Sequence, residues 1–352
     1  TKYILKEFSR YKDLRIDLVT SSIDSFKIEQ LSENITIHYL NINKNNQNLH
    51  TQSNKDLISY SIKAYSYAKK LLKQNQYDLC HSFFTLPCGY VAQKPKLPLI
   101  VSLRGSDVPF YNENYKYLDK FLFKRLSKNI WKRSNYVIAN SNNLKNLALM
   151  TSPKQEIDII YNGIDVKEFM PKNHYLQKGK LRVLCVGRLV KRKGISYLID
   201  AIKPLNKNIE LTIIGDGPLR ESLREQSKGY NVRFLGIIEH DRMPEIYSEH
   251  DVFVMSSFYE GMSNTLLEAL ASGLPMIVTN TGGSVNLVRG NGYIVDFENS
   301  RQITDCLQKY LDDNNLIEEH GRKSIQIAKE MTWESVADSY YKYYLEMVYK
   351  EQ

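Results

Sequence analysis

The stretch "DVFVMSSFYEGMSNTLLEALASGLPMIVT", residues 251–279, contains two short apolar runs separated by a helical pattern. The runs 251–256 and 274–279 have the length and the Val, Ile and Met content of buried strands. Between them, Gly261 permits a sharp turn, and Ser, Asn and Thr at 263–265 are residues that commonly precede a helix. We therefore expect a helix that begins at Ser263 or Asn264. This order of strand, helix and strand is typical of a parallel α/β sheet.

The same alternation of apolar runs and helical patterns extends in both directions along the chain. In the second half, the runs lie at 181–187, 209–215, 231–236 and 292–297. In the first half they lie at 15–20, 35–40, 77–82, 98–103, 135–140 and 157–162, with helical patterns at 55–74 and 115–133. A polar segment at 170–180, with a Pro and a Gly, is typical of a linker.

These patterns, together with a length of 352 residues, predict an α/β protein with two doubly wound domains. We place the first at 1–170, the second at 171–330, and a helix rich in aromatic residues at 331–352. The chain begins with a helical pattern, whereas an open α/β domain usually begins with a strand and a Gly-containing turn. We therefore expect that the native gene encodes one strand and one loop before Thr1.

Composition excludes several classes of protein. The hydrophobic content of 42% and charged content of 25% are ordinary for a globular protein, and no apolar run reaches the 18 residues of a membrane span. Cys80, Cys88, Cys185 and Cys306 are scattered, without the spacing of a metal site. They are typical of small buried side chains in a reducing compartment.

The net charge of +9 is unevenly distributed. Residues 1–170 carry +10, and residues 171–352 carry −1. A basic half indicates an anionic partner such as nucleic acid or a phospholipid surface. A solvated, lysine-rich surface is an equally good interpretation of the charge alone.

Two carboxylates bracket the predicted helix start. Glu260 and Glu268 are eight positions apart, so a continuous helix would place both on one face, whereas Gly261 puts Glu260 on a loop. The free amides at a helix start favour an anionic or oxygen-rich ligand. The alternative is that both are ordinary acidic side chains, one in solvent and one within the helix.

A second candidate site lies between the strand that ends at Gly187 and the helix that opens near Gly194. Four cations, Arg188, Lys191, Arg192 and Lys193, stand in this short loop. Guanidinium and ammonium groups beside a helix start form an anion site. The order of residues is not that of a P-loop. A solvated basic turn is the alternative interpretation.

At this point the chain resembles a known family. The motifs that carry the resemblance are "GRLVKRKG" (187–194), "IIGDGPLRESL" (213–223), "VRFLG" (232–236), residues 251–283, "NGYIV" (291–295), "IIYNGIDVKEFMP" (159–171) and "TWESVADSYYKYY" (332–344). Together they resemble the retaining nucleotide-sugar glycosyltransferases of the GT-B fold with an E-x7-E motif, and they cover nearly the whole chain.

The resemblance implies a fold and a reaction. The fold would be GT-B, two Rossmann-like domains facing each other across a cleft, with the C-terminal helix bracing the first domain. The reaction would be retaining transfer of a sugar from a UDP-, GDP- or ADP-sugar to a glycan or lipid-linked glycan, in cell-surface polysaccharide biosynthesis. The family is generally independent of metal, and the donor would replace any cofactor. The expected location is cytoplasmic with peripheral contact at the inner membrane face, and nucleic acid is not an expected partner.

The resemblance also assigns roles to individual residues. Arg188 and Lys193 match the pair that holds the donor diphosphate, Glu260 the residue that contacts donor sugar hydroxyls, and Glu268 the residue that accepts from the ribose. The other donor-side positions are Gly187, Gly236, Ile237, Gly261, Met262, Ser263, Asn264 and Thr265. On the acceptor side stand His81, Arg104 and Asp107. Arg104 occupies a position where the family more commonly has His, which puts any imidazole role there in doubt. A structural role is the main alternative for His81.

Two other functions remain open from the sequence. A nucleotide-sugar epimerase shares this architecture, and a noncatalytic subunit could bind a nucleotide sugar or a lipid surface. The presence of Arg188, Lys193, Glu260 and Glu268 favours an enzyme over the noncatalytic subunit. For the membrane contact, the aromatic and basic segment 108–128 could lie in lipid head groups, or it could form an ordinary helix packed on its own sheet.

Overall fold

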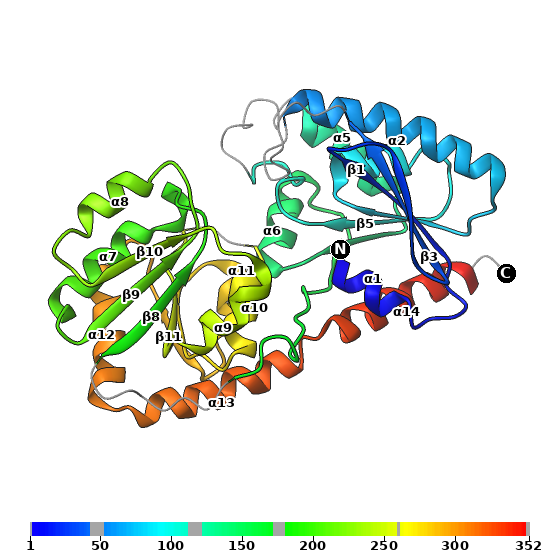
Figure 1. Ribbon diagram of the computed structural model, residues 1–352. Coiled ribbons are helices and arrows are strands. Elements are labelled where there is room, and N and C mark those ends of the chain that lie inside the picture. Colours follow the sequence, from blue (N-terminus) through cyan, green and yellow to red (C-terminus); the bar gives the residue numbers. More distant parts are fainter. Residues whose placement is uncertain (1, 43–52, 112–121, 172–179, 259–260, 350–352) are drawn as a thin grey trace. The chain divides into compact units, whose positions relative to one another are not determined.

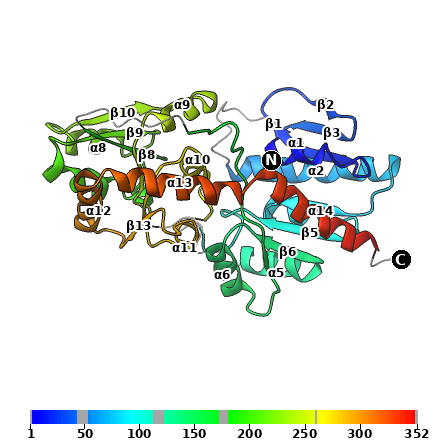
Figure 2. The ribbon, with the colours of Figure 1, turned by 90° about the horizontal axis from the view of Figure 1, so that it is seen from below.

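The computed structural model describes residues 2–42, 53–111, 122–171, 180–258 and 261–349. The chain forms two compact units (Figures 1 and 2). Unit 1 comprises Thr1–Tyr161 and Val336–Gln352, and unit 2 comprises Asn162–Ser335. Among the described residues, no helix is both long enough and apolar enough to cross a bilayer.

Unit 2 is built on a six-stranded parallel sheet with the strand order β10-β9-β8-β11-β12-β13. The strands are β8 (Leu181–Val186), β9 (Ile209–Ile214), β10 (Val232–Gly236), β11 (Val252–Met255), β12 (Met276–Thr279) and β13 (Gly292–Val295). β11 and β12 are buried at every position, as expected for central strands covered on both faces. The chain reverses its strand order between β8 and β11, and the site described below lies at the carboxyl ends of these strands.

Helices cover both faces of this sheet (Figure 1). They are α7 (Ile195–Ile202), α8 (Arg220–Gln226), α9 (Met243–Ser248), α10 (Asn264–Ala271), α11 (Gly282–Val285), α12 (Ser300–Asp312) and α13 (Asn315–Lys329). On one side α7 and α12 pack together, and their apolar side chains join β8, β9 and β11 in a continuous core. On the other side α10 packs against α13.

Unit 1 contains two sheets. Strands β4 (Cys80–Phe83), β5 (Leu99–Leu103), β6 (Tyr136–Ala139) and β7 (Asp158–Ile159) form a parallel sheet in that order. Strands β1 (Ile16–Ser22), β2 (Lys27–Ser32) and β3 (Ile35–Asn41) form the second, in which β3 pairs in parallel with β1 and antiparallel with β2. Its helices are α1 (Lys2–Phe8), α2 (Asn54–Gln74), α3 (Tyr90–Ala92), α5 (Lys124–Arg133), α6 (Asn142–Thr151) and most of α14 (Trp333–Tyr349).

The division between the units falls earlier than the predicted boundary after residue 170. Residues from Asn162 onward belong to unit 2 because they are tied to its C-terminal end. The Ile164 N–H donates to the Met331 carbonyl (2.8 Å), and a Cβ on Gly163 would lie 2.6 Å from the Trp333 nitrogen. At the other end, the helix expected at 331–352 begins at Trp333 and belongs to unit 1 from Val336. Most of the predicted linker, residues 172–179, lies outside the described residues.

Candidate functional site

The cationic loop of unit 2 is fixed by backbone hydrogen bonds to the neighbouring loop. β8 ends at Val186, and the Gly187 and Leu189 amides then donate to the carbonyls of Ile214 and Asp216, each at 2.9 Å. A Cβ on Gly215 would lie 2.1 Å from the Gly187 oxygen, so the two loops touch backbone to backbone. The carboxyl ends of β8 and β9 therefore form a rigid platform under the cations.

Gly194 closes the cationic loop and starts α7. Its φ of +61° lies in the left-handed region that favours glycine, and a Cβ there would be 2.1 Å from the Ser256 oxygen. Ser256 also donates through its hydroxyl to the Lys193 carbonyl (3.0 Å), and the Phe258 amide donates to the Arg192 carbonyl (2.8 Å). The loop that follows β11 is thus held directly against the cationic loop.

Arg188 and Lys193 differ in their surroundings. Lys193 is half-buried, and its side chain folds back so that its Cε lies 3.5 Å and its Nζ 3.6 Å from the position of a Cβ on Gly187. Arg188 is exposed, and no carboxylate in the described part of the chain pairs with it. The structure places one fixed and one solvent-facing cation at the end of β8, an arrangement that suits an anionic ligand.

The start of α10 agrees with the prediction. The helix begins at Asn264, with Ser263 at the preceding capping position. The Ser263 hydroxyl bonds to the Thr265 hydroxyl (2.9 Å) and makes no capping bond to an amide of the helix. The Ser263 side chain therefore leaves the first amides of α10 to other hydrogen-bond acceptors.

The loop before α10 also packs against the end of β12 and the start of α11. A Cβ on Gly283 would lie 1.9 Å from the Gly261 oxygen, and Thr279 donates to the Ser257 carbonyl. Met262 is buried, so its side chain contributes packing. Glu260 lies outside the described residues.

Glu268 is a buried carboxylate with two neighbouring side-chain donors. It is 7% exposed, its Oε2 accepts from the Tyr247 hydroxyl (2.8 Å), and its Oε1 lies 3.4 Å from the His240 Nε2. Burial raises the pKa of Glu268, and the Tyr247 and His240 contacts oppose that shift. His240 also lies near Glu168, with 3.5 Å between Nδ1 and Oε1. The carboxylate is thus held in a fixed orientation one turn into α10.

Tyr247, His240 and Glu168 were not predicted as part of the site. They come from α9, from the turn before it, and from the segment that follows Asn162. None stands in a motif with Glu268, so sequence spacing gave no signal. Of the donor-side candidates, Gly236 ends β10 and Ile237 follows it; Gly236 has a φ of +73° and accepts from the Gly215 amide (2.7 Å). The Ile237 side chain is 78% exposed.

The three acceptor-side candidates lie in unit 1. Asp107 is buried, and it accepts from the amides of Arg104 and Gly105 (2.9 Å each) and Thr85 (2.7 Å). Burial raises the pKa of Asp107, against the effect of these bonds. The carboxylate therefore ties together two loops at the ends of β4 and β5.

His81 is held at both ring nitrogens. Nδ1 bonds to the Tyr344 hydroxyl (2.6 Å) and Nε2 to the Ser102 hydroxyl (2.8 Å). Burial, and then the positive charge of Arg104, lower the pKa of His81 to about 3. This geometry favours the structural interpretation of His81. Arg104 is half-buried, with its guanidinium carbon 4.7 Å from the centroid of the Phe83 ring.

Comparison with known proteins identifies the class. The family model described as Glycosyl transferases group 1 matches residues 180–313, and that of Glycosyltransferase Family 4 matches residues 33–168. Sucrose-phosphate synthase from Thermosynechococcus elongatus has a similar structure, with a TM-score of 0.81 over 98% of this chain and 91% of that one, at 21% identity. The fold is therefore the GT-B fold of glycosyltransferases.

Proteins with similar sequences are also glycosyltransferases. An uncharacterised glycosyltransferase of Methanocaldococcus jannaschii is 27% identical over 99% of this chain and 94% of its own length. The UDP-Gal:alpha-D-GlcNAc-diphosphoundecaprenol alpha-1,3-galactosyltransferase of Escherichia coli is 28% identical over 73% of this chain and 72% of its own. This chain belongs to the group 1 glycosyl transferases, and it is a nucleotide-sugar-dependent glycosyltransferase with relatives in cell-surface polysaccharide synthesis.

Proposed function

We propose that this glycosyltransferase transfers a sugar, with retention of anomeric configuration, from a nucleoside diphosphate sugar to a glycan or lipid-linked glycan. The observation that carries the proposal is the packing of two loops in unit 2. The cationic loop with Arg188 and Lys193 is bonded through Ser256 and Phe258 to the loop that leads into α10. A diphosphate on the cations would therefore lie beside the start of α10.

This arrangement suits the departure of a nucleoside diphosphate. As the glycosidic bond to phosphate breaks, negative charge grows on the leaving oxygens. Fixed cations and amides lower the barrier when they are already oriented toward that charge. We propose that Arg188 and Lys193 perform this task without a metal ion. Glu268 would accept from the ribose hydroxyls, and Glu260 would orient the donor sugar.

The acceptor proposal rests on relatives and on charge. The Escherichia coli relative is named for a diphosphoundecaprenol acceptor. We propose a lipid-linked acceptor of the same general kind here, and with it a cytoplasmic protein in peripheral contact with the inner membrane face. The bases and sugars to be tested are those of UDP-, GDP- and ADP-sugars.

Calorimetric titration with UDP, GDP and ADP tests the donor site. Arg188→Ala removes a charge-assisted contact worth about 1.5–3 kcal/mol, so binding of the preferred nucleotide should weaken roughly tenfold or more. Arg322→Ala, which removes an exposed arginine of α13, is the matched control and should bind as the unaltered protein does. Equal affinity of the Arg188→Ala and unaltered proteins would refute the placement of the diphosphate.

Turnover assays test the reaction. With a sugar nucleotide and a lipid-linked acceptor, release of nucleoside diphosphate should persist in EDTA, and the product linkage should keep the donor's anomeric configuration. Glu260→Gln should lower turnover while nucleotide binding is retained. Conversion of the sugar nucleotide without transfer would instead identify an epimerase.

A further inference from the structure

The positive charge of the molecule is concentrated in unit 1. Residues 1–161 and 336–352 contain 26 basic and 16 acidic residues, a net charge of +10, whereas unit 2 carries −1. Helix α2 contributes five lysines and a single acidic residue, Asp56. Asp56 is already engaged, because its side chain accepts from the Ser53 amide (2.8 Å) in the cap of the helix.

One side of α2 packs on unit 1 and the other does not. Ala64 and the partly buried Tyr60 and Tyr67 join a core that includes Leu40 of β3, and the Tyr60 hydroxyl donates to the Val19 carbonyl (3.2 Å). On another face, Ile58, Ile62 and Tyr65 are 61%, 63% and 45% exposed. Two exposed isoleucines on adjacent turns form a contiguous apolar patch, and such patches often mark interaction surfaces.

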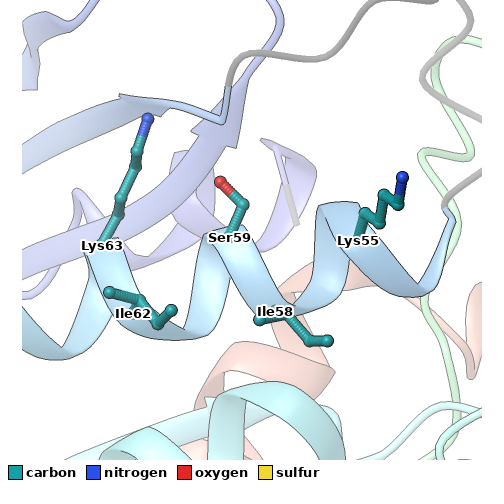
Figure 3. Close-up of a pocket in the computed structure, with 5 residues that line it drawn as sticks. All are labelled: Lys55, Ile58, Ser59, Ile62 and Lys63. Carbon is teal, nitrogen blue, oxygen red and sulfur yellow. The ribbon is translucent and has the colours of Figure 1, made fainter.

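The exposed residues form a stripe. Ile58, Ile62, Tyr65, Lys69 and Lys73 follow one another at steps of three or four, so they share one face of the helix, and both lysines are exposed. A shallow hollow of about 380 Å³ lies along the start of the stripe, lined by Lys55, Ile58, Ser59, Ile62 and Lys63. In Figure 3 the side chains of Ile58 and Ile62 project together from one side of the helix, and those of Lys55, Ser59 and Lys63 from the other.

We propose that this stripe, from Ile58 to Lys73, docks unit 1 on an anionic phospholipid surface. The isoleucines and tyrosine would enter the boundary between head groups and acyl chains, while the lysines meet lipid phosphates. No acidic side chain stands on the stripe, and the charge of +10 on the same unit attracts the same surface at longer range. The inference rests on the membrane contact proposed above and assigns it to α2.

Sedimentation with vesicles tests the assignment. The protein is mixed with vesicles of phosphatidylcholine alone or with phosphatidylglycerol added, at low and high salt. We expect binding only to the phosphatidylglycerol vesicles, and weakening by salt. Ile58→Gln with Ile62→Gln should reduce binding roughly tenfold or more, and Lys69→Gln with Lys73→Gln roughly twenty-five-fold, at about fivefold per lysine.

Two matched controls separate the stripe from general effects. Lys207→Gln with Lys329→Gln makes the same change in net charge on exposed lysines of unit 2. Met150→Gln removes an apolar side chain of α6 that is 66% exposed. Both controls should bind vesicles as the unaltered protein does. If they weaken binding as much as the stripe variants, or if the unaltered protein ignores the vesicles, the proposal is overturned.

Nucleotide binding, measured on the same variants, keeps the two proposals apart. The stripe variants should bind UDP, GDP or ADP with unchanged affinity, because the donor-side residues lie in unit 2. Vesicle binding through α2 without turnover of any donor would sink the proposed reaction and leave the docking surface standing. Turnover of a donor with no vesicle binding would do the reverse.

Discussion

Glu268 is a buried carboxylate whose ionisation is opposed by its surroundings. Burial raises the pKa of Glu268, so the folded protein resists its ionisation more than the unfolded chain does. As the pH rises from the pKa of Glu268 in the unfolded chain through its higher pKa in the folded protein, the free energy of unfolding falls. Such a charge is retained where it has a partner to bind, and the ribose is the partner that we propose.

Glu268→Gln separates the two effects. It keeps an oxygen for the Tyr247 hydroxyl and removes the buried charge. At pH 7 the melting temperature of the free protein should rise, while nucleoside diphosphate binding should weaken roughly tenfold or more. Glu221→Gln on α8, an exposed position, should change neither. A lower melting temperature, or unchanged nucleotide affinity, would contradict this view of Glu268.

Gly194 and Gly229 form a natural pair for testing how tightly the cationic loop is built. Both have positive φ, +61° and +81°, but a Cβ on Gly229 meets nothing within 4 Å, whereas one on Gly194 overlaps the Ser256 oxygen. Gly229→Ala should cost about 1 kcal/mol of unfolding free energy, the backbone strain alone. Gly194→Ala should cost roughly 3 kcal/mol or more and also weaken nucleotide binding. Equal losses in urea unfolding would show that the loop can move aside.

His81 makes unit 1 sensitive to acid. Its pKa is about 3 in the folded protein, far below the ordinary value. Between a pH of about 6.5 and about 3, the imidazole is therefore protonated in the unfolded chain and neutral in the folded protein. Stability should therefore fall as the pH drops from about 6.5 toward 3, by about 1.4 kcal/mol per pH unit for this group. His250 in unit 2, with a pKa lowered to about 4 chiefly by burial, acts in the same direction.

Urea unfolding at several pH values measures this dependence. The His81→Gln protein should be less stable than the unaltered one at pH 7, yet its stability should fall less steeply below a pH of about 6.5. Parallel curves for the two proteins would mean that another group controls the acid response.

At the scale of elements, α14 is part of the core of unit 1. Tyr344 and Tyr340 are buried, Tyr344 bonds to His81 of β4, and Tyr340 bonds to Ser102 of β5 (2.9 Å). Farther along the helix, Glu346 accepts from the Tyr136 hydroxyl of β6 (2.8 Å). One helix thus connects three strands of the parallel sheet through polar side chains.

Removing one hydroxyl from α14 tests this connection. Tyr344→Phe leaves the buried Nδ1 of His81 without its partner and should cost about 1–3 kcal/mol of unfolding free energy. Tyr349→Phe changes a side chain that is 66% exposed at the end of the same helix, and it should stay within about 0.5 kcal/mol of the unaltered protein. Denaturation curves that coincide for the two variants would show that the Tyr344–His81 hydrogen bond does not contribute to the free energy of unfolding.

The elements that could be predicted from sequence are those with strong local patterns. The apolar runs at 181–187 and 251–256 became β8 and β11 because buried parallel strands need Val, Ile and Leu at nearly every position. β2 was missed because "KIEQLS" has no such run, and its Ile28 is 53% exposed. Tyr247 and His240 were missed because tertiary packing, not spacing, brings them to Glu268. The role of Glu268 itself came from family resemblance.

At the scale of the whole molecule, two compact units imply two unfolding events. The residues proposed to hold the diphosphate and ribose all belong to unit 2. Saturating nucleoside diphosphate, at about a hundred times its dissociation constant, should stabilise unit 2 by about 2.7 kcal/mol. In scanning calorimetry, one transition should move upward and the other stay in place. His81→Gln should identify the unmoved transition as unit 1 by lowering it alone.

Because α14 follows unit 2 in the sequence, unit 1 is synthesised in two parts, one before and one after unit 2. Residues 1–161 leave the ribosome before unit 2, but the helix that supplies Tyr340 and Tyr344 is made only after nearly all of unit 2. Unit 2 extends to Ser335, so it can reach its native structure while unit 1 still lacks α14. Until α14 is made, the surface of β4 and β5 that receives it stays uncovered, and a ribosome that stops at the end of unit 2 would release a chain with unit 2 complete and unit 1 incomplete.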